Sequence, residues 1–347
     1  MRTRRLLLSL LFSLGVTLLT AVALTTKPLP IAHAADLTVD TTLDNESNGC
    51  DTDNCTLREA ITDANSGDTI IFDLTYPATI TLTSGQITID KDLTIDGPGA
   101  DQLAISGNDA SRVFYISGGK VTIDDLKVTQ GMAPIFGGGI HIVNSNTVVT
   151  LTRINVVGNS ASTGAGGGVF LRTGSLLIEG GQILSNTADT GGGISLESGE
   201  ATLNEGEIRG NTAEYAGGVY VGSDLGTATF TMTGISIIGY NTAHSSGGGL
   251  YVDNGIAVLS SGQVISNTAQ GTDVDNGGGG LYISGVASVT VCGGHHQQHR
   301  QIRWRAVSRF RRSDANLWRD SQQHCRQRRW NIPRIRRGNV EWRANHQ

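Results

Sequence analysis

Short apolar segments, each bounded by glycine, serine or asparagine, recur along the middle of this 347-residue chain. One set follows clusters of glycine and comprises residues 140–142, 169–171, 194–196, 219–221, 250–252 and 281–283. A second set lies between these segments and comprises residues 175–179, 201–204, 228–233 and 257–260. Short apolar runs enclosed by turn-forming residues are typical of β-strands. The pattern predicts two or three short strands in each repeat.

The repeat itself is marked by the phrase Asn-Thr-Ala or its variant Asn-Ser-Ala. Its asparagines are separated by 27, 25, 30 and 26 residues, and they are Asn159, Asn186, Asn211, Asn241 and Asn267. A propeller blade needs about 40–50 residues, and the glycine content excludes helical repeats, because each glycine in a helix costs about 1 kcal/mol relative to alanine. Stacked coils of about 25 residues would instead pair every strand with the coils above and below. We therefore expect an all-β fold, a single-stranded right-handed parallel β-helix, which is a solenoid.

Stacking places equivalent residues of successive coils above one another. The five asparagines are therefore expected to form an internal ladder, in which each side-chain amide hydrogen-bonds to the next at a spacing of about 4.8 Å. We expect these amides to be buried.

The first 34 residues have the order of a secretory signal peptide. Three arginines precede the apolar run 6–24, and the small-residue triplet Ala32-His33-Ala34 follows it. Cleavage after Ala34 would make Ala35 the new N-terminus. The alternative is an uncleaved anchor, because 19 mostly apolar residues approach the length that spans a bilayer. With cleavage, we expect a secreted or cell-surface protein without a transmembrane segment.

Residues 35–75 are expected to form an N-terminal cap, followed by coils over residues 76–291. Thr56 and Glu59 have the spacing of a capping box, so a helix is predicted near residues 56–65. Leu57, Ile61 and Ala64 fall on one side of that helix and would seal the first coil. Open solenoid ends expose apolar side chains and unpaired backbone, which is why a cap is needed.

Cys50 and Cys55 precede this helix and are expected to form a disulfide in an exported chain. A zinc site is the less favoured alternative, because no second Cys or His pair with ligand spacing accompanies them. The acidic loop around Asp44, Asp51 and Asp53 offers oxygen ligands for Ca²⁺. It departs from the EF-hand pattern, so we expect a solvated loop with no metal and no cofactor.

Residues 55–61, Cys-Thr-Leu-Arg-Glu-Ala-Ile, resemble the CSLREA motif, which names a small domain at the N-terminus of exported bacterial β-helix proteins. The flanking residues 44–50 and 67–72 are similar to the usual flanks of that motif. The repeated Ser-Asn-Thr-Ala and Gly-Gly-Gly-Leu-Tyr phrases resemble coils of polymorphic outer-membrane adhesins and of the wider pectate-lyase-like superfamily. The resemblance implies export and a β-helix, and it implies no catalytic residue here.

Charge separates two parts of the chain. Residues 35–291 carry eight Lys or Arg against 28 Asp or Glu, which argues against nucleic acid as a partner. Their acidic residues are scattered and His141 and His244 are isolated, so no catalytic arrangement is evident. We expect a structural, adhesive or glycan-binding protein, with extracellular glycans or surface proteins as partners. The alternative is a polysaccharide lyase or glycoside hydrolase on the same scaffold, which a cluster of three or more carboxylates on one face would favour.

Residues 292–347 differ from the rest, with fourteen Arg, three acidic residues and all four Trp. Read one base later, the codons for residues 295–300, His-His-Gln-Gln-His-Arg, admit Ile-Ile-Ser-Asn-Thr-Ala, which is close to Val-Ile-Ser-Asn-Thr-Ala at 264–269. Each Trp codon likewise becomes a glycine codon, where glycines are due. We therefore expect a frameshift near codon 294 and a non-native tail. The alternative is a basic tail that binds nucleic acid or a membrane surface.

Overall fold

The computed structural model describes residues 35–44, 49–50, 54–222, 226–271, 277–285 and 287–291. Contacts divide the chain after Ala34, and these residues belong to the second of the two units. They form a parallel β-solenoid of about eight turns with one helix, so the predicted all-β solenoid is confirmed. The predicted signal peptide, 1–34, and the predicted frameshifted tail, 292–347, lie outside the described residues.

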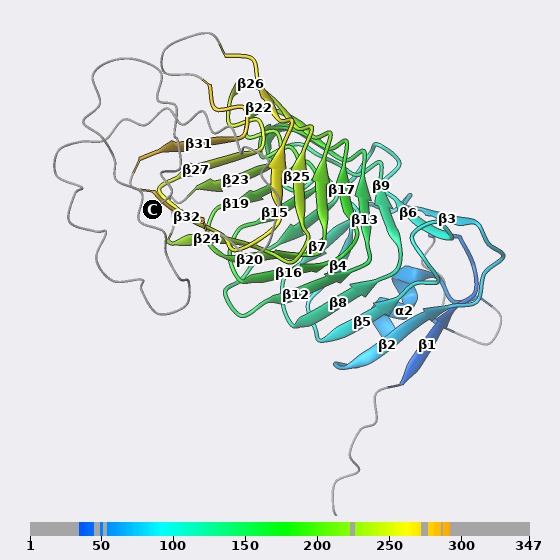
Figure 1. Ribbon diagram of the computed structural model, residues 1–347. Helices are drawn as coiled ribbons and strands as arrows, with labels where there is room; N and C mark the ends of the chain where they lie inside the picture. The colour runs from blue at the N-terminus through cyan, green and yellow to red at the C-terminus, as the bar shows by residue number, and fades with distance from the viewer. Residues whose placement is uncertain are drawn as a thin grey trace, which may run out of the picture. The chain divides into compact units, whose positions relative to one another are not determined.

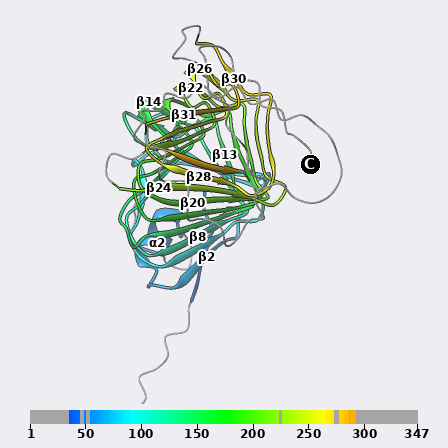
Figure 2. The same cartoon turned by 60° about the vertical axis from the view of Figure 1, so that its left-hand side comes forward.

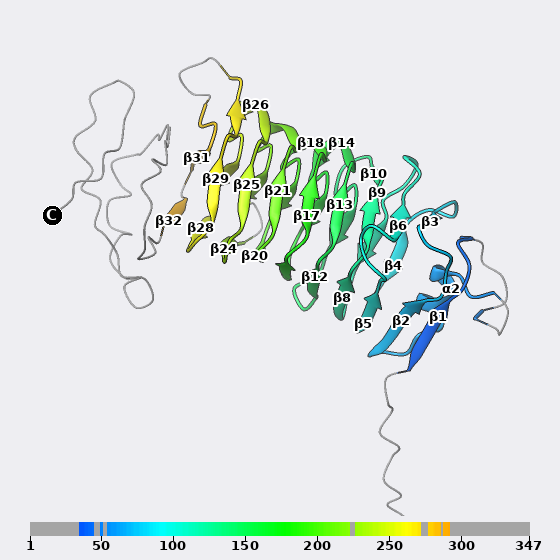
Figure 3. The same ribbon diagram turned by 45° about the vertical axis from the view of Figure 1, so that its right-hand side comes forward.

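Three of the four parallel sheets, A, B and C, begin in the N-terminal coils, and sheet D begins later (Figures 1 and 3). Each sheet takes one strand from each successive coil that it spans. Sheet A contains β1 (Asp36–Val39), β2 (Asp68–Phe72), β5 (Leu93–Asp96), β8 (Lys120–Asp124), β12 (Val148–Thr152), β16 (Ser175–Glu179), β20 (Gly199–Asn204), β24 (Ala228–Thr233), β28 (Ile256–Leu259) and β32 (Ser288–Val291). Sheet B contains β3 (Ala78–Thr81), β6 (Leu103–Ser106), β9 (Lys127–Thr129), β13 (Asn155–Val157), β17 (Gln182–Leu184), β21 (Glu207–Arg209), β25 (Ile237–Gly239) and β29 (Gln263–Ile265).

The other two sheets complete each coil. Sheet C contains β4 (Ile87–Ile89), β7 (Phe114–Ile116), β11 (Ile140–Ile142), β15 (Val169–Leu171), β19 (Ile194–Leu196), β23 (Val219–Gly222), β27 (Leu250–Asp253) and β31 (Leu281–Ser284). Sheet D contains β10 (Met132–Ala133), β14 (Ser160–Ala165), β18 (Thr187–Thr190), β22 (Thr212–Tyr215), β26 (Thr242–Ser246) and β30 (Thr268–Ala269). A full coil thus passes through sheets A, B, D and C in that order. In Figure 2 the strands of sheet D lie in the upper part of the view and those of sheet A lie below them.

Alternation along each strand creates the core. In β16, Leu176 and Ile178 point inward and are buried, while Glu179 is exposed. Parallel in-register pairing then stacks Leu176 between Val149 and Ala201 of the adjacent coils. Each fully buried Leu or Ile side chain contributes about 1.5–3 kcal/mol, so the interior column is the main source of stability.

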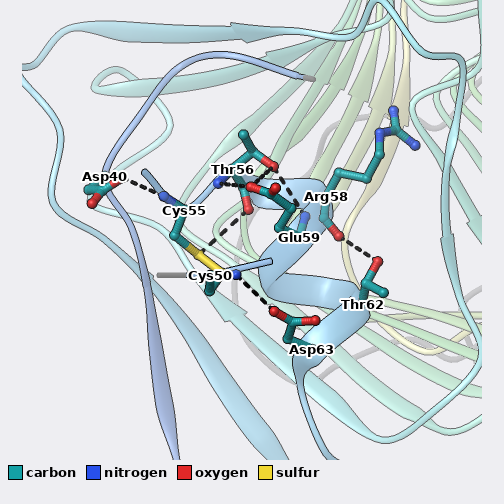
Figure 4. Close-up of a disulfide and its surroundings, with 8 residues drawn as sticks. All are labelled: Asp40, Cys50, Cys55, Thr56, Arg58, Glu59, Thr62 and Asp63. Carbon is teal, nitrogen blue, oxygen red and sulfur yellow. Dashed lines mark hydrogen bonds between the residues drawn. A yellow bond between two sulfur atoms is a disulfide. The ribbon is translucent and has the colours of Figure 1, made fainter. Parts of the chain in front are cut away.

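The cap is formed by helix α2 (Leu57–Asp63), shown with its surroundings in Figure 4. The helix is shorter than the predicted 56–65, because Ala64 leaves the helical conformation with ψ at 136°. Lys91 Nζ donates to the carbonyl groups of Ile61, Thr62 and Ala64 at 3.1, 3.1 and 2.8 Å. This cation satisfies carbonyls that a helix C-terminus leaves unpaired. Among the described residues, no helix has the length and apolar character needed to cross a membrane.

Candidate binding face

The predicted asparagine ladder is present inside the solenoid, at the turn between sheets B and D. Asn186 Oδ1 accepts hydrogen bonds from both the backbone N and Nδ2 of Asn159, at 2.8 and 3.0 Å. The same pair of bonds joins Asn186 to Asn211 at 2.9 and 3.0 Å, and Asn211 to Asn241 at 3.0 and 2.9 Å. Asn159, Asn186, Asn211 and Asn241 are each at most 1% exposed. The amides therefore satisfy buried turn backbone as well as one another.

The ends of the ladder differ from its centre. Asn267 accepts from Asn241 N and Nδ2, both at 2.9 Å, yet it is only half-buried. The expectation of a fully buried rung is wrong there, because the described chain supplies no rung beyond it. At the other end, Gly131 N donates to Asn159 Oδ1 at 2.8 Å. A Cβ on Gly131 would lie 2.2 Å from the carbonyl oxygen of Gly138, so an asparagine does not fit at this position.

The predicted cap residues lie close together. A disulfide joins Cys50 and Cys55, whose Cα atoms are 4.4 Å apart (Figure 4). Thr56 Oγ1 accepts from Glu59 N at 3.2 Å and Glu59 Oε2 accepts from Thr56 N at 3.0 Å, which is the reciprocal capping box.

The suggested calcium ligand Asp44 has a different role in the structure. Its carboxylate receives two hydrogen bonds from the Arg58 guanidinium, at 2.9 and 3.1 Å, and two more from the backbone N atoms of Thr83 and Ser84. Arg58 also donates to the carbonyl of Gly85 at 2.7 Å. Asp44 thus fastens the cap to the first coils, while Asp51 and Asp53 lie outside the described residues.

A row of aromatic side chains runs along the outer face of sheet C. Alternation along each sheet C strand turns the middle residue away from the solenoid core. This residue is buried in β11, β15 and β19 and partly exposed in β23, β27 and β31. The in-register pairing aligns these outward residues in the order Tyr115, His141, Phe170, Ser195, Tyr220, Tyr251 and Tyr282. Figure 1 shows the strands that carry them, from β7 to β31.

A second row on the neighbouring sheet D side contributes two more rings. Its register runs through Phe136, Ala165, Thr190, Tyr215 and Ser246. Phe136 and Tyr215 are 37% and 42% exposed, so each presents aromatic surface to solvent.

The rings gather in two clusters. Phe136 stacks on Phe170, with ring centroids 4.5 Å apart, and His141 lies 5.1 Å from Phe170. Tyr251 is the centre of the second cluster and meets the rings of Tyr220, Tyr282 and Tyr215, with centroids at 5.4, 4.7 and 6.3 Å. Those three contacts have interplanar angles of 72°, 73° and 62°, so faces and edges alternate along the row, the arrangement that ring quadrupoles favour.

The coil between the clusters carries Ser195 and Thr190 in the two rows. Ser195 lies in register between Phe170 and Tyr220. Phe170 and Ser195 are each only 2% exposed, so the first cluster reaches solvent chiefly through Phe136. The accessible aromatic surface is therefore Phe136 on the first cluster and the partly exposed tyrosines of the second cluster. We call this set of residues, both rows together, the aromatic face.

His141 is a packing residue within the first cluster. It is 7% exposed, and neither ring nitrogen has a hydrogen-bond partner among the described residues. Burial, reinforced by the charges of Arg112 and Arg172, lowers the pKa of His141 to about 3. The ring is therefore neutral at physiological pH and contributes no cation to the face.

Arg112 connects this cluster to its surroundings. It donates to the carbonyls of Phe136 and Gly137, and its guanidinium lies 5.7 Å from the ring centroid of Tyr115. Burial lowers the pKa of Arg112. These bonds hold Phe136 over Phe170, so the arginine positions an exposed ring.

Carboxylates meet an arginine elsewhere, at the corner between sheets A and B. Arg153 contacts Asp124 and Asp125 at 2.7 and 2.6 Å. Burial, together with the charges of Asp125 and Asp96, raises the pKa of Asp124 against the opposing effect of Arg153. Within the described ranges, no group of three or more His, Cys, Asp or Glu side chains is arranged to hold a metal ion.

Sequence reasoning missed the aromatic face, although part of its signal was present. Residues 250–252 and 281–283 are predicted strands, and alternation along a strand requires their middle residues, Tyr251 and Tyr282, to face away from the core. Phe136 and Tyr215 carry no such signal, because their positions depend on turns between sheets D and C. Comparison of the chain with protein-family models, curated proteins and solved structures finds no match.

Proposed function

We propose that this chain is an exported β-solenoid protein of the cell surface or extracellular space, which binds a neutral polysaccharide along its aromatic face in an adhesive or structural role. The observation that carries the proposal is the line of partly exposed tyrosines on sheet C, Tyr220, Tyr251 and Tyr282, together with the exposed rings of Phe136 and Tyr215. The signal-peptide pattern of residues 1–34 and the resemblance of residues 55–61 to the CSLREA motif support export.

The chemistry of the rings fits a sugar. A pyranose has an apolar face of C–H bonds, which carry partial positive charge and are attracted to the negative face of an aromatic ring. Tyrosines add hydroxyls for the polar edge of the sugar, and Tyr251 Oη is hydrogen-bonded to Ser284 Oγ at 3.1 Å. Ser284 also donates to Asp253 Oδ1 at 2.8 Å, so polar groups border the second cluster.

The extent of the face fits a polymer. Successive rungs of a parallel sheet are about 4.8 Å apart, and the row continues from Tyr115 to Tyr282. An extended chain aligned with the solenoid axis can contact both clusters at once. Two linked contacts of modest strength then act together, since the second becomes intramolecular.

Charge argues for a neutral ligand. The region 35–291 carries an excess of 20 acidic over basic residues, and such a field repels polyanions. The basic groups near the face are already engaged: Arg112 by backbone carbonyls, and Arg172 by Glu197 at 3.7 Å. Polyuronides are therefore expected to bind more weakly than uncharged glycans.

Three carboxylates do gather on one face, because Asp96 pairs with Asp124 on the adjacent strand and Asp125 is the next residue. This is the arrangement expected of the enzymatic alternative, a polysaccharide lyase or hydrolase. We favour a binding role because the group lies away from the aromatic face. Asp124 and Asp125 share Arg153 at the corner between sheets A and B, whereas the aromatic face follows sheets C and D. Carboxylates that cleave a bound glycan would need to lie beside the scissile bond. Release of reducing ends or of unsaturated products from any polysaccharide tested would favour the enzyme.

The test compares binding of uncharged and anionic polysaccharides to the exported protein. Affinity electrophoresis with soluble glucan, xylan and mannan should retard the protein, and polygalacturonate should do so less. Tyr251→Ala should weaken binding about tenfold or more, as for central aromatic anchors. Tyr240→Ala is the matched control, because Tyr240 is 52% exposed and lies outside both rows, between sheets B and D. Equal binding by both variants, or no binding to any uncharged glycan, would contradict the proposal.

A further inference from the structure

We infer that Ala35 becomes the N-terminus of the exported protein and that its α-ammonium group docks on the buried carboxylate of Asp68. This ion pair would exist only after processing. The inference rests on the export part of the proposed function and is independent of glycan binding.

The geometry at the start of β1 is already that of a docked terminus. Ala35 N donates to Asp68 Oδ1 at 2.8 Å, and Ala35 O accepts from Thr69 N at 2.9 Å. Pairing of β1 with β2 begins one residue later, at Asp36 and Thr69. Cleavage after Ala34 therefore leaves every hydrogen bond of β1 in place.

Asp68 is prepared to receive a cation. It is 3% exposed, and its second oxygen accepts from Asn65 N at 2.8 Å and from Asn65 Nδ2 at 3.4 Å. The hydrogen bonds from the backbone of Ala35 and Asn65, with a further contribution from Lys91, lower the pKa of Asp68, so the carboxylate is charged at neutral pH. A buried carboxylate is stabilised most when a full positive charge is close.

Cleavage changes the donor from neutral to charged. Hydrolysis of the Ala34–Ala35 peptide bond by a signal peptidase consumes one water, whose oxygen bonds to the Ala34 carbonyl carbon while the C–N bond breaks. Ala34 leaves as a carboxylate and the Ala35 nitrogen becomes an ammonium. The amide bond to the Asp68 carboxylate is already charge-assisted, and cleavage adds the Coulomb attraction of a full positive charge on the donor.

Other charged groups lie on the elements around this pair. The basic ones are Lys91, whose Nζ is bound to carbonyls at the end of α2, and Arg58 of α2, which is bound to Asp44. The acidic ones on β1, on α2 and beside Lys91 are Asp36, Glu59, Asp63, Asp90 and Asp92. These acids favour a cation at Ala35.

The pair predicts a pH dependence that only the processed chain shows. An α-amino group ordinarily titrates near 7.7–8.0, and the Asp68 carboxylate should raise its pKa in the folded state. The stabilisation by the Ala35 ammonium is then fully present at pH values below the ordinary pKa of an α-amino group. It is lost as pH rises through the raised pKa of the folded state. The pKa of Asp68 is lowered in the folded state. Its carboxylate therefore adds stability at pH values above the ordinary pKa of an aspartate, and this stability is lost as pH falls through the lowered pKa.

The experiment exports the full chain from a secreting bacterium and determines its N-terminus by intact mass and Edman sequencing. The expected N-terminal residue is Ala35. Thermal melting is then followed from pH 6 to pH 10, where the exported protein should lose about 2–4 °C of Tm as the terminus deprotonates. A variant with one Gly inserted between Ala34 and Ala35 moves the ammonium away and should lack this decline.

Asp68→Asn should also lack the decline, while Asp73→Asn, which removes an exposed carboxylate just beyond β2, should keep it. If Asp68→Asn does not fold, the Gly insertion alone still tests the pair. An N-terminus other than Ala35, or the same alkaline decline with the inserted Gly, would overturn the inference. None of these variants touches the aromatic face, so either result leaves the glycan-binding test unaffected.

Discussion

Replacing Asn211 by alanine tests whether the internal ladder stabilises the solenoid. Asn211 Oδ1 accepts from Asn186 N and Nδ2 at 2.9 and 3.0 Å, and Asn211 Nδ2 donates to Ile183 O and Asn241 Oδ1, both at 2.9 Å. The alanine variant removes all four bonds. Asn186 is 0% exposed, so water cannot replace the acceptor that its two N–H groups lose.

The magnitude follows from those orphaned donors. A buried donor left without a partner costs about 1–3 kcal/mol, and two donors, with the small cavity, predict a loss of about 3–5 kcal/mol in the free energy of unfolding. Asn267→Ala should cost a similar amount, because it leaves the backbone N and Nδ2 of Asn241, which is also 0% exposed, without their acceptor. Thr212→Ala, on the next residue and half-exposed, is the control and should cost about 1 kcal/mol or less.

Urea unfolding followed by circular dichroism gives the free energies, and hydrogen exchange gives the local effect. Protection of the Asn186 backbone amide should fall in Asn211→Ala, because its acceptor is gone. A loss for Asn211→Ala within about 1 kcal/mol of that for Thr212→Ala would refute the reasoning, since the amide bonds would then contribute no more than a surface side chain.

Three further predictions concern the cap, the aromatic face and the gene. Arg58→Met leaves Asp44 buried without its cation and should lower the free energy of urea unfolding by about 3–5 kcal/mol; a loss under about 1 kcal/mol would contradict the role of this pair. His141 has a pKa of about 3 in the folded protein, so the unfolded chain takes up its proton first and stability should fall as pH drops below about 6.5. His141→Phe should show a shallower decline in Tm between pH 7 and pH 4, and an unchanged decline would argue against burial of a neutral imidazole. Sequencing the gene around codon 294 should reveal a one-base insertion or its equivalent, and a shifted frame without Gly-Gly-Gly repeats would exclude the frameshift.

Several features of this protein follow from the sequence alone because they depend on local spacing or on the repeat. The capping box of Thr56 and Glu59 needs only residues three apart, and the disulfide joins cysteines five apart. The ladder from Asn159 to Asn241 follows from the repeat, because stacking coils of similar length superposes equivalent positions. Parallel pairing then requires no information beyond the period.

Only the tertiary structure decides contacts that join unlike positions of the coils or of the cap. Arg58 donates to Asp44, 14 residues before it, and Ala35 donates to Asp68, 33 residues after it. No repeated motif in the sequence indicates either contact. The aromatic face depends on which residue of each sheet C triplet faces outward and on turns that carry Phe136 and Tyr215 to its border. Spacing along the chain predicts which residues stack, but the path of the backbone through each turn determines which side chains from different sheets share a surface.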